Sequence, residues 1–422
     1  MDSDAGCAMT VSLNKMFRVF GRIGILSFGG PAAQISLMQT ELVDRHKWLT
    51  ESQFLQALSF CMLLPGPEAM QLATYAGWKL RGVRGGLLAG LLFVLPGAVV
   101  IFALAFGYAY FGQMPVVQTV FAGIKAAVVV IVFQALYKLA RRALRGGLAL
   151  TLALGSFMAI FLFSVPFPAI IGVAAVIGLV SVRTGATDDP PVPVVTRAGT
   201  VRTVVTWGAI WAAPLLTLWA LDATLLLQLG LFFSKLAVVT FGGAYAVLAY
   251  MTQEIVQSYG WLNTDQMIDA LGLAETTPGP LILVTQFAGF MTGFLQGGPG
   301  FAMVAASVTL WVTFVPCFLW IFAAAPYVEA LLARPRLKGA FDAISASVAG
   351  VILNLAVWFT LHVLFTDVGK GAIVPALRLD SFSVQNASLV LLAVFIYVGL
   401  RVPMVSGLAV MALLAWGIDL LV

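Results

Sequence analysis

The chain has few charged side chains, since Asp, Glu, Lys and Arg together make up 10% of its 422 residues, whereas hydrophobic residues make up 61%. A soluble protein carries roughly 25% charged residues, so the composition excludes an ordinary soluble domain. The chain has only three cysteines, without metal-site or redox spacing, and two histidines, His46 and His362. A disulfide framework and a metal centre are therefore not expected.

Several functional motifs are also missing. The sequence contains no GxxxxGK[ST] phosphate-binding loop, no HExxH motif and no evident Ser/His pairing, which argues against an ATP-driven pump and an intramembrane hydrolase. We expect neither enzymatic activity nor a cofactor. The net charge of +5 is explained by basic cytoplasmic loops and requires no nucleic-acid partner. The acidic amino-terminal segment lacks the features of a cleaved signal peptide.

Long apolar runs take the place of charge. Residues 85–107, 116–137 and 204–221 approach or exceed the roughly 20 apolar residues that cross a bilayer as a helix. These runs are too long for barrel strands and do not alternate in polarity. The sequence therefore predicts an all-α polytopic protein of the cell (inner) membrane, surrounded by the lipid bilayer.

The two halves of the chain resemble each other. SFGGPAAQISLMQTELV (27–43) aligns with TFGGAYAVLAYMTQEIV (240–256) at an offset of 213 residues, and this offset also pairs the two Pro-Gly-Pro triplets. Farther along, an offset of 220 pairs Pro96 with Pro316. An internal repeat of this length indicates two homologous structural units.

The connection between the halves predicts how they are oriented. We assign residues 12–182 to a first transporter repeat, 183–202 to a cytoplasmic linker, 203–221 to an unpaired transmembrane helix and 222–422 to a second repeat. One unpaired crossing would invert the second repeat relative to the first. The basic clusters agree, because Lys and Arg gather in loops of the first half whose second-half counterparts are not basic, whereas the basic segment 333–338 has an uncharged counterpart. Inverted-topology repeats are typical of transporters, with a substrate site near the bilayer midplane.

Each half is interrupted at Pro-Gly-Pro, a strong helix breaker, and at Phe-Gly-Gly. The apolar arms on each side of Pro65-Gly66-Pro67 are too short to span a membrane. Two arrangements remain open: a re-entrant hairpin with its tip at Pro-Gly-Pro, or one long broken helix. The basic loop 44–47 favours the hairpin.

A helix that starts after such a break presents unpaired N–H groups and the positive end of its dipole, which suits an anion. Glycine pairs beside a hydroxyl allow the backbone to approach a ligand closely. Ordinary helix packing and kinking would be the favoured explanation of a single copy, but two matching copies favour a site. Its candidate substrate-binding residues are Arg22, Ser27, Gly29, Gly30, Gln34, Pro65, Gly66, Pro67, Gln71, Lys235, Thr240, Gly242, Gly243, Tyr245, Thr276, Thr277, Pro278, Gly279 and Pro280.

Charged residues inside apolar segments are functional candidates by default. Arg22 and Lys235 occupy equivalent positions in the two repeats and would suit a tetrahedral dianion. The alternatives are snorkelling to the interface or an ion pair with Glu41 or Glu254. The candidate coupling or gating residues are Glu41, Glu68, Lys125, Glu254 and Glu275, of which Glu68 serves equally well as a helix cap.

The motifs FGGPAAQI, CMLLPGPEAMQLATYAGW, FFSKLAVVTFGGAYAVL and GLAETTPGP resemble the chromate ion transporter family, in its long-chain, two-domain form. The resemblance covers about residues 12–412. Gln34 stands where many members have histidine. The resemblance implies efflux of chromate from the cytoplasm, driven by the electrochemical gradient and conferring chromate resistance, with sulfate as a chemical analogue. Uptake of sulfate or another anion is the alternative, and a channel is a further one. The sequence leaves the oligomeric state open, including a homodimer.

Overall fold

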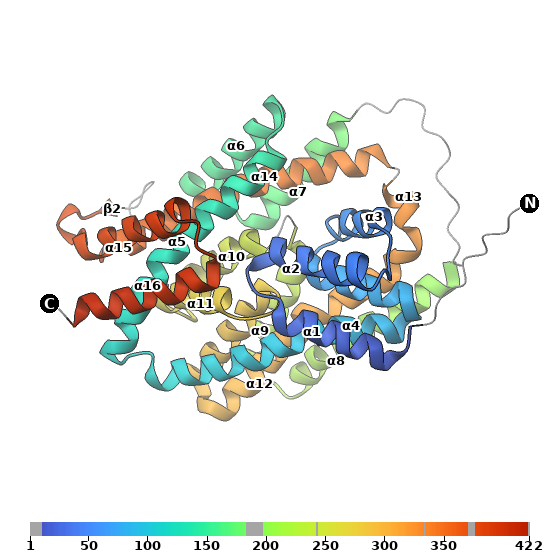
Figure 1. Cartoon of the computed structure of the whole chain (residues 1–422), viewed down its shortest axis with the longest axis horizontal. Coiled ribbons are helices and arrows are strands. Elements are labelled where there is room, and N and C mark those ends of the chain that lie inside the picture. Colours follow the sequence, from blue (N-terminus) through green and yellow to red (C-terminus); the bar gives the residue numbers. More distant parts are fainter. Residues whose placement is uncertain (1–10, 183–196, 242–243, 333, 370–375, 421–422) are drawn as a thin grey trace, which may run out of the picture.

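The computed structural model describes residues 11–182, 197–241, 244–332, 334–369 and 376–420. Almost all of them are helical (Figure 1). The first half contains α1 (Leu13–Leu26), α2 (Gly30–Gln39), α3 (Glu51–Cys61), α4 (Glu68–Phe111), α5 (Pro115–Ala143), α6 (Gly147–Phe163) and α7 (Phe167–Ser181). The second half contains α9 (Thr224–Val239), α10 (Ala244–Thr252), α11 (Thr264–Thr276), α12 (Val284–Ala324), α13 (Val328–Leu332), α14 (Pro335–Leu364), α15 (Val384–Val394) and α16 (Met404–Asp419).

Between the halves lies α8 (Arg197–Ala220), which begins within the segment expected to be the linker; residues 183–196 of that segment are outside the described part. Short elements complete the fold. Three π-helical turns follow α2, α10 and α15, and the strands β1 (Val368–Gly369) and β2 (Ala376–Leu377) pair antiparallel. The sequence had not predicted strands, and these two are only two residues long.

The order of elements is repeated in the two halves. Each half has a short helix, a Phe-Gly-Gly break, a second short helix ending in a π-helical turn, a helix leading to Pro-Gly-Pro, and then a long kinked helix. Capping boxes at Thr50 and Asn263 start the corresponding helices α3 and α11, because in each the cap and the glutamine three residues later satisfy each other's backbone N–H groups. Equivalent sequence signals thus produce equivalent elements.

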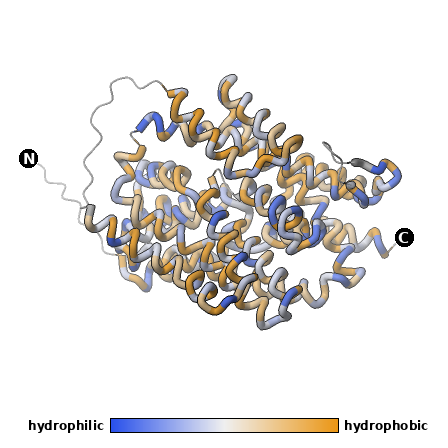
Figure 2. The backbone as a smooth tube through the Cα atoms, turned by 180° about the vertical axis from the view of Figure 1, so that it is seen from behind, coloured by the Kyte–Doolittle hydropathy of each residue, from blue (hydrophilic) through white to orange (hydrophobic). Residues whose placement is uncertain are grey.

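Within the described residues, five helical segments are long and apolar enough to cross a membrane. They are α4, α5, α8, α14 and the segment Leu281–Tyr327, which contains α12. Hydrophobic residues dominate the whole body of the molecule (Figure 2). Large apolar side chains such as Val99, Phe163 and Trp219 are exposed on its surface, which water would disfavour and lipid tails accept. The chain is therefore an all-α, multi-pass membrane protein.

The two longest helices each fold back on themselves. Backbone angles are not helical at Arg81 and Gly82 in α4 and at Gly298 in α12. Beyond the first kink the chain returns along its own first segment, because a Cβ on Gly77 would lie 2.3 Å from the carbonyl oxygen of Gly85. Each long helix is therefore a pair of antiparallel segments rather than one straight rod.

Small residues let the helices of one half pack closely against those of the other. A Cβ on Gly350 of α14 would lie 1.9 Å from the carbonyl oxygen of Ala153 in α6, and one on Gly123 of α5 would lie 2.2 Å from that of Met411 in α16. Such close backbone approach is the main source of helix association in membranes. The two halves are interlocked rather than separate bodies (Figure 1).

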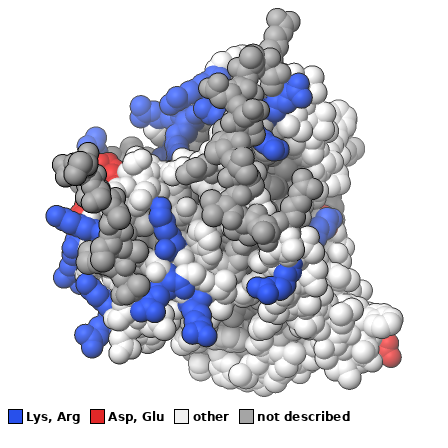
Figure 3. Space-filling model, turned by 90° about the vertical axis from the view of Figure 1, so that its right-hand side faces the viewer, with Lys and Arg blue, Asp and Glu red and all other residues white. Residues whose placement is uncertain are grey.

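Charge is distributed unevenly over the surface. Lys and Arg side chains gather on the face shown in Figure 3, where few acidic side chains are visible. At the start of α1 the Arg81 side chain donates to the carbonyl oxygen of Val11, 2.8 Å away. The basic kink of α4 therefore lies beside the beginning of α1.

Candidate functional site

The four helix breaks lie in gaps between regular helices. Pro65-Gly66-Pro67 separates α3 from α4, and Pro278-Gly279-Pro280 separates α11 from a short 3₁₀ turn (Leu281–Leu283) that precedes α12. Gly66 and Gly279 have φ angles of 120° and 85°, which residues with a Cβ rarely adopt. The Phe-Gly-Gly break of the first half separates α1 from α2, where Gly29 and Gly30 also have positive φ. Gly242 and Gly243, its counterparts, lie outside the described residues.

Each Pro-Gly-Pro tip is bonded to the Phe-Gly-Gly break of the other half. The backbone N–H of Gly66 donates to the carbonyl oxygen of Thr240 at 2.9 Å, and that of Gly279 donates to the carbonyl oxygen of Ser27 at 2.8 Å. Both carbonyls are available because their helices end at these residues, where the last carbonyls have no intrahelical partner. The side-chain hydroxyls of Ser27 and Thr240 bond back to the carbonyls of Ile23 and Leu236 in their own helices. The two reciprocal bonds bring all four breaks together.

The tips also pack against the long helices of the opposite half at equivalent points. A Cβ on Gly97, directly after Pro96, would lie 2.2 Å from the carbonyl oxygen of Pro278. A Cβ on Gly66 would lie 3.0 Å from the sulfur of Cys317, directly after Pro316. Pro96 and Pro316, which are equivalent in the repeat, thus directly precede Gly97 and Cys317, the residues against which the two tips are seated.

Buried glutamines line the breaks. Gln34 donates through Nε2 to the carbonyl oxygens of Gly279 at 2.6 Å and Ser27 at 3.3 Å, and Gln71 donates to that of Pro65 at 2.6 Å. Gln286 of α12 donates to the carbonyl oxygen of Ala98 at 3.0 Å. All three are at most 2% exposed. Gln286 makes one such bond, which leaves its second amide N–H for a ligand, whereas Gln71 also hydrogen-bonds Cys317.

The helices that start at the breaks have open amino-terminal ends. Among the described residues no side chain caps α2, α4 or the 3₁₀ turn at Leu281. The first N–H groups of these helices have no intrahelical acceptor, and the helix dipole places positive potential there. The region combines hydrogen-bond donors with positive potential, which is the chemistry that an oxyanion requires.

Arg22 lies outside this buried region. Its side chain is 51% exposed, and its Nε is 3.6 Å from Oε1 of Glu41, which Arg45 also contacts at 3.2 Å. The structure therefore forms the ion pair that was the alternative to a substrate-binding role. His46 is 3.6 Å from the same carboxylate. Partial burial lowers the pKa of His46 despite the opposing effect of Glu41, so this imidazole is neutral at pH 7.

The equivalent cation of the second half, Lys235, is exposed as well. Its Nζ lies 5.6 Å from the centroid of the Tyr250 ring, a cation–π distance. Its charge also interacts with that of Glu254. The structure thus places Arg22 and Lys235 on the outer faces of α1 and α9, each held by its own half, and does not bring them together at the breaks.

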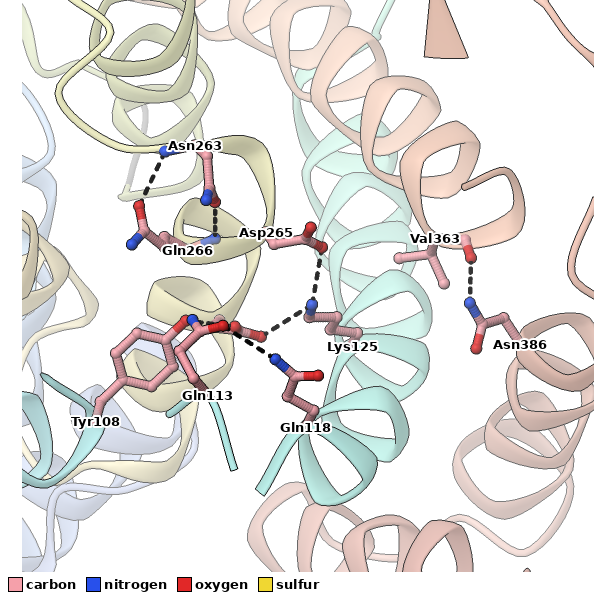
Figure 4. Close-up of polar contacts among 10 residues, drawn as sticks. Tyr108, Gln113, Gln118, Lys125, Asn263, Asp265, Gln266, Val363 and Asn386 are labelled. Atoms are coloured by element: carbon pink, nitrogen blue, oxygen red, sulfur yellow. Dashed lines mark hydrogen bonds and ion pairs between the residues drawn. The ribbon is translucent and has the colours of Figure 1, made fainter. Parts of the chain in front are cut away.

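Lys125 joins the first half to the second (Figure 4). Its Nζ is 3.0 Å from Oδ1 of Asp265 and 3.3 Å from Oδ1 of Asp269, both on α11. Asp269 is 6% exposed and accepts a 2.7 Å hydrogen bond from the hydroxyl of Tyr108. The cluster fixes the start of α11 to α5. The sequence had singled out Lys125 but not its partners.

At the other end of α11, Glu275 is 3% exposed and accepts a 2.7 Å hydrogen bond from the hydroxyl of Tyr245. The neighbouring hydroxyls of Thr276 and Thr277 donate to carbonyls of the last turn of α11, those of Leu273 and Ala274. Glu275 and Tyr245, predicted separately, are therefore direct partners beside the second tip.

Arg142 is a residue that the sequence interpretation did not assign to the site. Its guanidinium lies 3.8 Å from the sulfur of Met62, at the end of α3, and its charge interacts with that of Glu68 at the start of α4. It was considered only as a cytoplasmic basic residue, since 80 residues separate it from Met62 in the chain. A cation therefore lies beside the first Pro-Gly-Pro.

No group of residues in the described part has the composition of a metal site.

Comparison with known proteins agrees with this architecture. The chain is 31% identical over 350 residues to the "Chromate transport protein" of Cupriavidus metallidurans, an alignment covering 83% of each chain. It is 29% identical over 361 residues to the "Probable chromate transport protein" of Synechococcus elongatus (82% and 84% of the two chains), and 31% identical over 356 residues to the "Chromate transport protein" of Pseudomonas aeruginosa (81% and 80%). No solved structure matches the chain. The family model described as "Chromate transporter" matches residues 14–179 and again 227–418, and the chain accordingly belongs to the chromate transporter family.

Proposed function

We propose that the protein is a secondary transporter that exports chromate from the cytoplasm and so confers chromate resistance. The observation that carries this proposal is the pair of reciprocal bonds from Gly66 to Thr240 and from Gly279 to Ser27. Together they assemble four helix breaks, with uncapped helix starts and buried amide donors, into one polar region inside an apolar protein. Non-helical backbone at membrane depth is tolerated only where protein or a watery cavity surrounds it.

The two halves are proposed to be inverted repeats, residues 12–182 and 222–422, joined by a linker and an unpaired helix. Exchange of equivalent bonds between the halves supports this, because a two-fold relation generates each contact twice.

Phe60 and Tyr75, on the two sides of the first Pro-Gly-Pro, have ring centroids 5.7 Å apart, which supports a re-entrant hairpin rather than a straight broken helix.

The depth of the breaks supports a site near the midplane. Gly97, the seat of the second tip, lies roughly 15 residues, or about 22 Å, beyond the kink at Gly82. Half of a bilayer with its headgroup regions is about 20–22 Å thick. If the basic kink lies at the cytoplasmic surface, as basic loops do, the breaks lie in the middle of the membrane.

The proposed oxyanion site consists of the groups around the four breaks. Donors come from the second amide N–H of Gln286 and from the uncapped backbone at the tips and at the first Phe-Gly-Gly break, while Gln34, Gln71 and Tyr245 line the site and bond to its carbonyls and to Glu275. Arg22 and Lys235 keep a proposed role at the rim rather than at the centre, because both are exposed and already have partners. Arg142 supplies the cation that lies close to a tip.

Export needs no ATP. Moving a dianion out of a negative-inside cell releases about 4.6 kcal/mol per 100 mV, at roughly 2.3 kcal/mol per charge, which corresponds to a concentration ratio of about 2,000. Sulfate, a dianion of the same shape, is proposed to compete for the site.

The proposal is tested with purified protein in liposomes loaded with chromate. An imposed potential, negative inside, should drive chromate out, and sulfate should slow this flux. Liposomes with the Gly66→Val variant provide the comparison, since a side chain at that φ disrupts the first tip. If the wild-type protein moves chromate no faster than protein-free liposomes under the potential, the proposed function is wrong. If chromate flux is unsaturable, the protein is a channel rather than a transporter.

A further inference from the structure

Glu275 differs from the other acidic residues that the structure describes. Of its two carboxylate oxygens, Oε1 accepts the bond from Tyr245, while Oε2 is buried without a hydrogen-bond partner. No cation among the described residues lies within ion-pair distance of it. Glu41 and Asp269, the other carboxylates that are buried in the described part of the chain, both have cationic partners. A buried carboxylate with one donor and no cation is costly in its ionised form.

In the described part of the chain, no other charged group lies near enough to Glu275 to compensate its charge. Tyr245 of α10 and Tyr397 of the π-helical turn after α15 interact with it electrostatically. From α5, Lys125 reaches only the opposite end of α11, where it binds Asp265 and Asp269, and Tyr108 of α4 bonds to Asp269. Asp419 of α16 bonds to Thr119 instead. No neighbouring cation therefore holds Glu275 in its ionised form. Its protonation state depends on whether an anion is bound at the proposed site.

Glu275 also lies where an oxyanion is proposed to bind. Only two residues separate it from Pro278, and its partner Tyr245 follows the second Phe-Gly-Gly break. A dianion bound beside the second tip and an ionised Glu275 repel each other strongly in a medium of low dielectric constant. Binding of the anion and protonation of Glu275 therefore favour each other, and by linkage the effect is reciprocal.

The repeat fixes the number of protons. The position equivalent to Glu275 in the first half is Met62, which cannot titrate. Only one of these two equivalent positions therefore carries a titratable side chain, and Glu68, at the first tip, has the charge of Arg142 nearby. When the site is empty, the hydroxyl of Tyr245 stabilises the ionised form of Glu275 by its hydrogen bond.

We propose that Glu275 is the coupling residue and that one proton travels with each oxyanion. This rests on the proposed function. The carboxylate takes a proton from water on the side where chromate enters, stays neutral while the dianion is bound, and releases the proton to water on the other side with the anion. The empty site returns with Glu275 ionised. Each cycle then moves one net negative charge instead of two.

The experiment measures the chromate gradient that the reconstituted protein reaches in liposomes. At an imposed potential of about 100 mV without a pH gradient, one net charge gives a concentration ratio of about 50, whereas two charges give about 2,000. A pH gradient of one unit should change the wild-type ratio tenfold, with acid on the chromate side driving uptake. In Glu275→Gln the carboxamide keeps an acceptor for Tyr245 but carries no proton. This variant should reach a ratio near 2,000 and ignore the pH gradient.

Asp269→Asn on the same helix is the matched control and should keep the wild-type pH response. A wild-type ratio near 2,000, or wild-type flux that ignores the pH gradient, overturns the proton coupling and leaves chromate transport standing. A Glu275→Gln variant that still follows the pH gradient also overturns it. Absence of any wild-type chromate flux instead refutes the proposed function. If Glu275→Gln does not fold, the wild-type charge ratio decides the question alone.

Discussion

Replacing Gly97 by alanine should disturb the second tip without unfolding the protein. The added Cβ would lie 2.2 Å from the carbonyl oxygen of Pro278, whereas ordinary contacts begin at 3.4 Å, so the two backbones must separate by about 1.2 Å. The carbonyl cannot move alone, because the next residue, Gly279, is bonded to Ser27 at 2.8 Å. Overpacking of this kind costs about 1–3 kcal/mol.

Part of that cost is offset, since alanine favours a helix over glycine by up to about 1 kcal/mol. A net penalty of about 1–2 kcal/mol on the assembled site corresponds to a roughly tenfold loss of chromate flux. Flux in liposomes and the thermal midpoint in detergent measure the two effects. Gly107→Ala on the same helix is the control, because nothing lies within 4 Å of its Cβ position. Wild-type flux and stability in Gly97→Ala would show that the tip is not seated against α4.

Three further sets of variants test other parts of the structure. Lys125→Met should lower the thermal midpoint, because it leaves its buried aspartate partner unpaired, at a cost of about 3–5 kcal/mol. Arg22→Gln and Lys235→Gln should each lower chromate flux in liposomes while leaving membrane insertion intact, because the proposed rim cations attract the dianion. Single cysteines in place of Arg142 and Arg336 should both react with an impermeant thiol reagent from the cytoplasmic side, because basic loops of inverted halves face the same compartment.

Each of these variants has its own comparison. The double variant Lys125→Met/Asp269→Asn should recover stability relative to Lys125→Met, and failure to do so would contradict the buried ion pair. Arg18→Gln, an exposed cation on the same helix as Arg22, should transport normally. Full flux in Arg22→Gln or Lys235→Gln would remove that residue from the rim. Labelling of the two cysteines from opposite sides would contradict the inversion.

The positions of the helix breaks could be predicted because their cause is local. Proline and positive-φ glycine interrupt a helix whatever surrounds them, and the repeat made each break visible twice. The Arg22–Glu41 pair was foreseen as an alternative for a similar reason, since both residues belong to one short segment of one half. The helical class followed from the apolar runs alone.

The partners across the halves could not be predicted. That Gly66 bonds to Thr240, that Lys125 meets Asp269, and that Arg142 reaches Met62 all depend on how two sets of helices dock. Helix docking in a membrane is decided by close packing of small residues, which the pattern of one sequence does not resolve. The sequence therefore named most of the candidate residues but grouped the exposed cations with the buried amides.

The exchange of bonds between the tips has a consequence for chains of half the length. Such a chain has one glycine N–H at its Pro-Gly-Pro tip and one free carbonyl at its Phe-Gly-Gly break, but in this fold neither satisfies the other. Under the proposed inversion of the halves, two half-length chains must meet in opposite orientations in the membrane to form the pair of bonds that Gly66 and Gly279 make here. A cell that used such chains would have to insert the two in opposite directions in comparable amounts, whereas fusion through one extra helix secures both conditions in a single polypeptide.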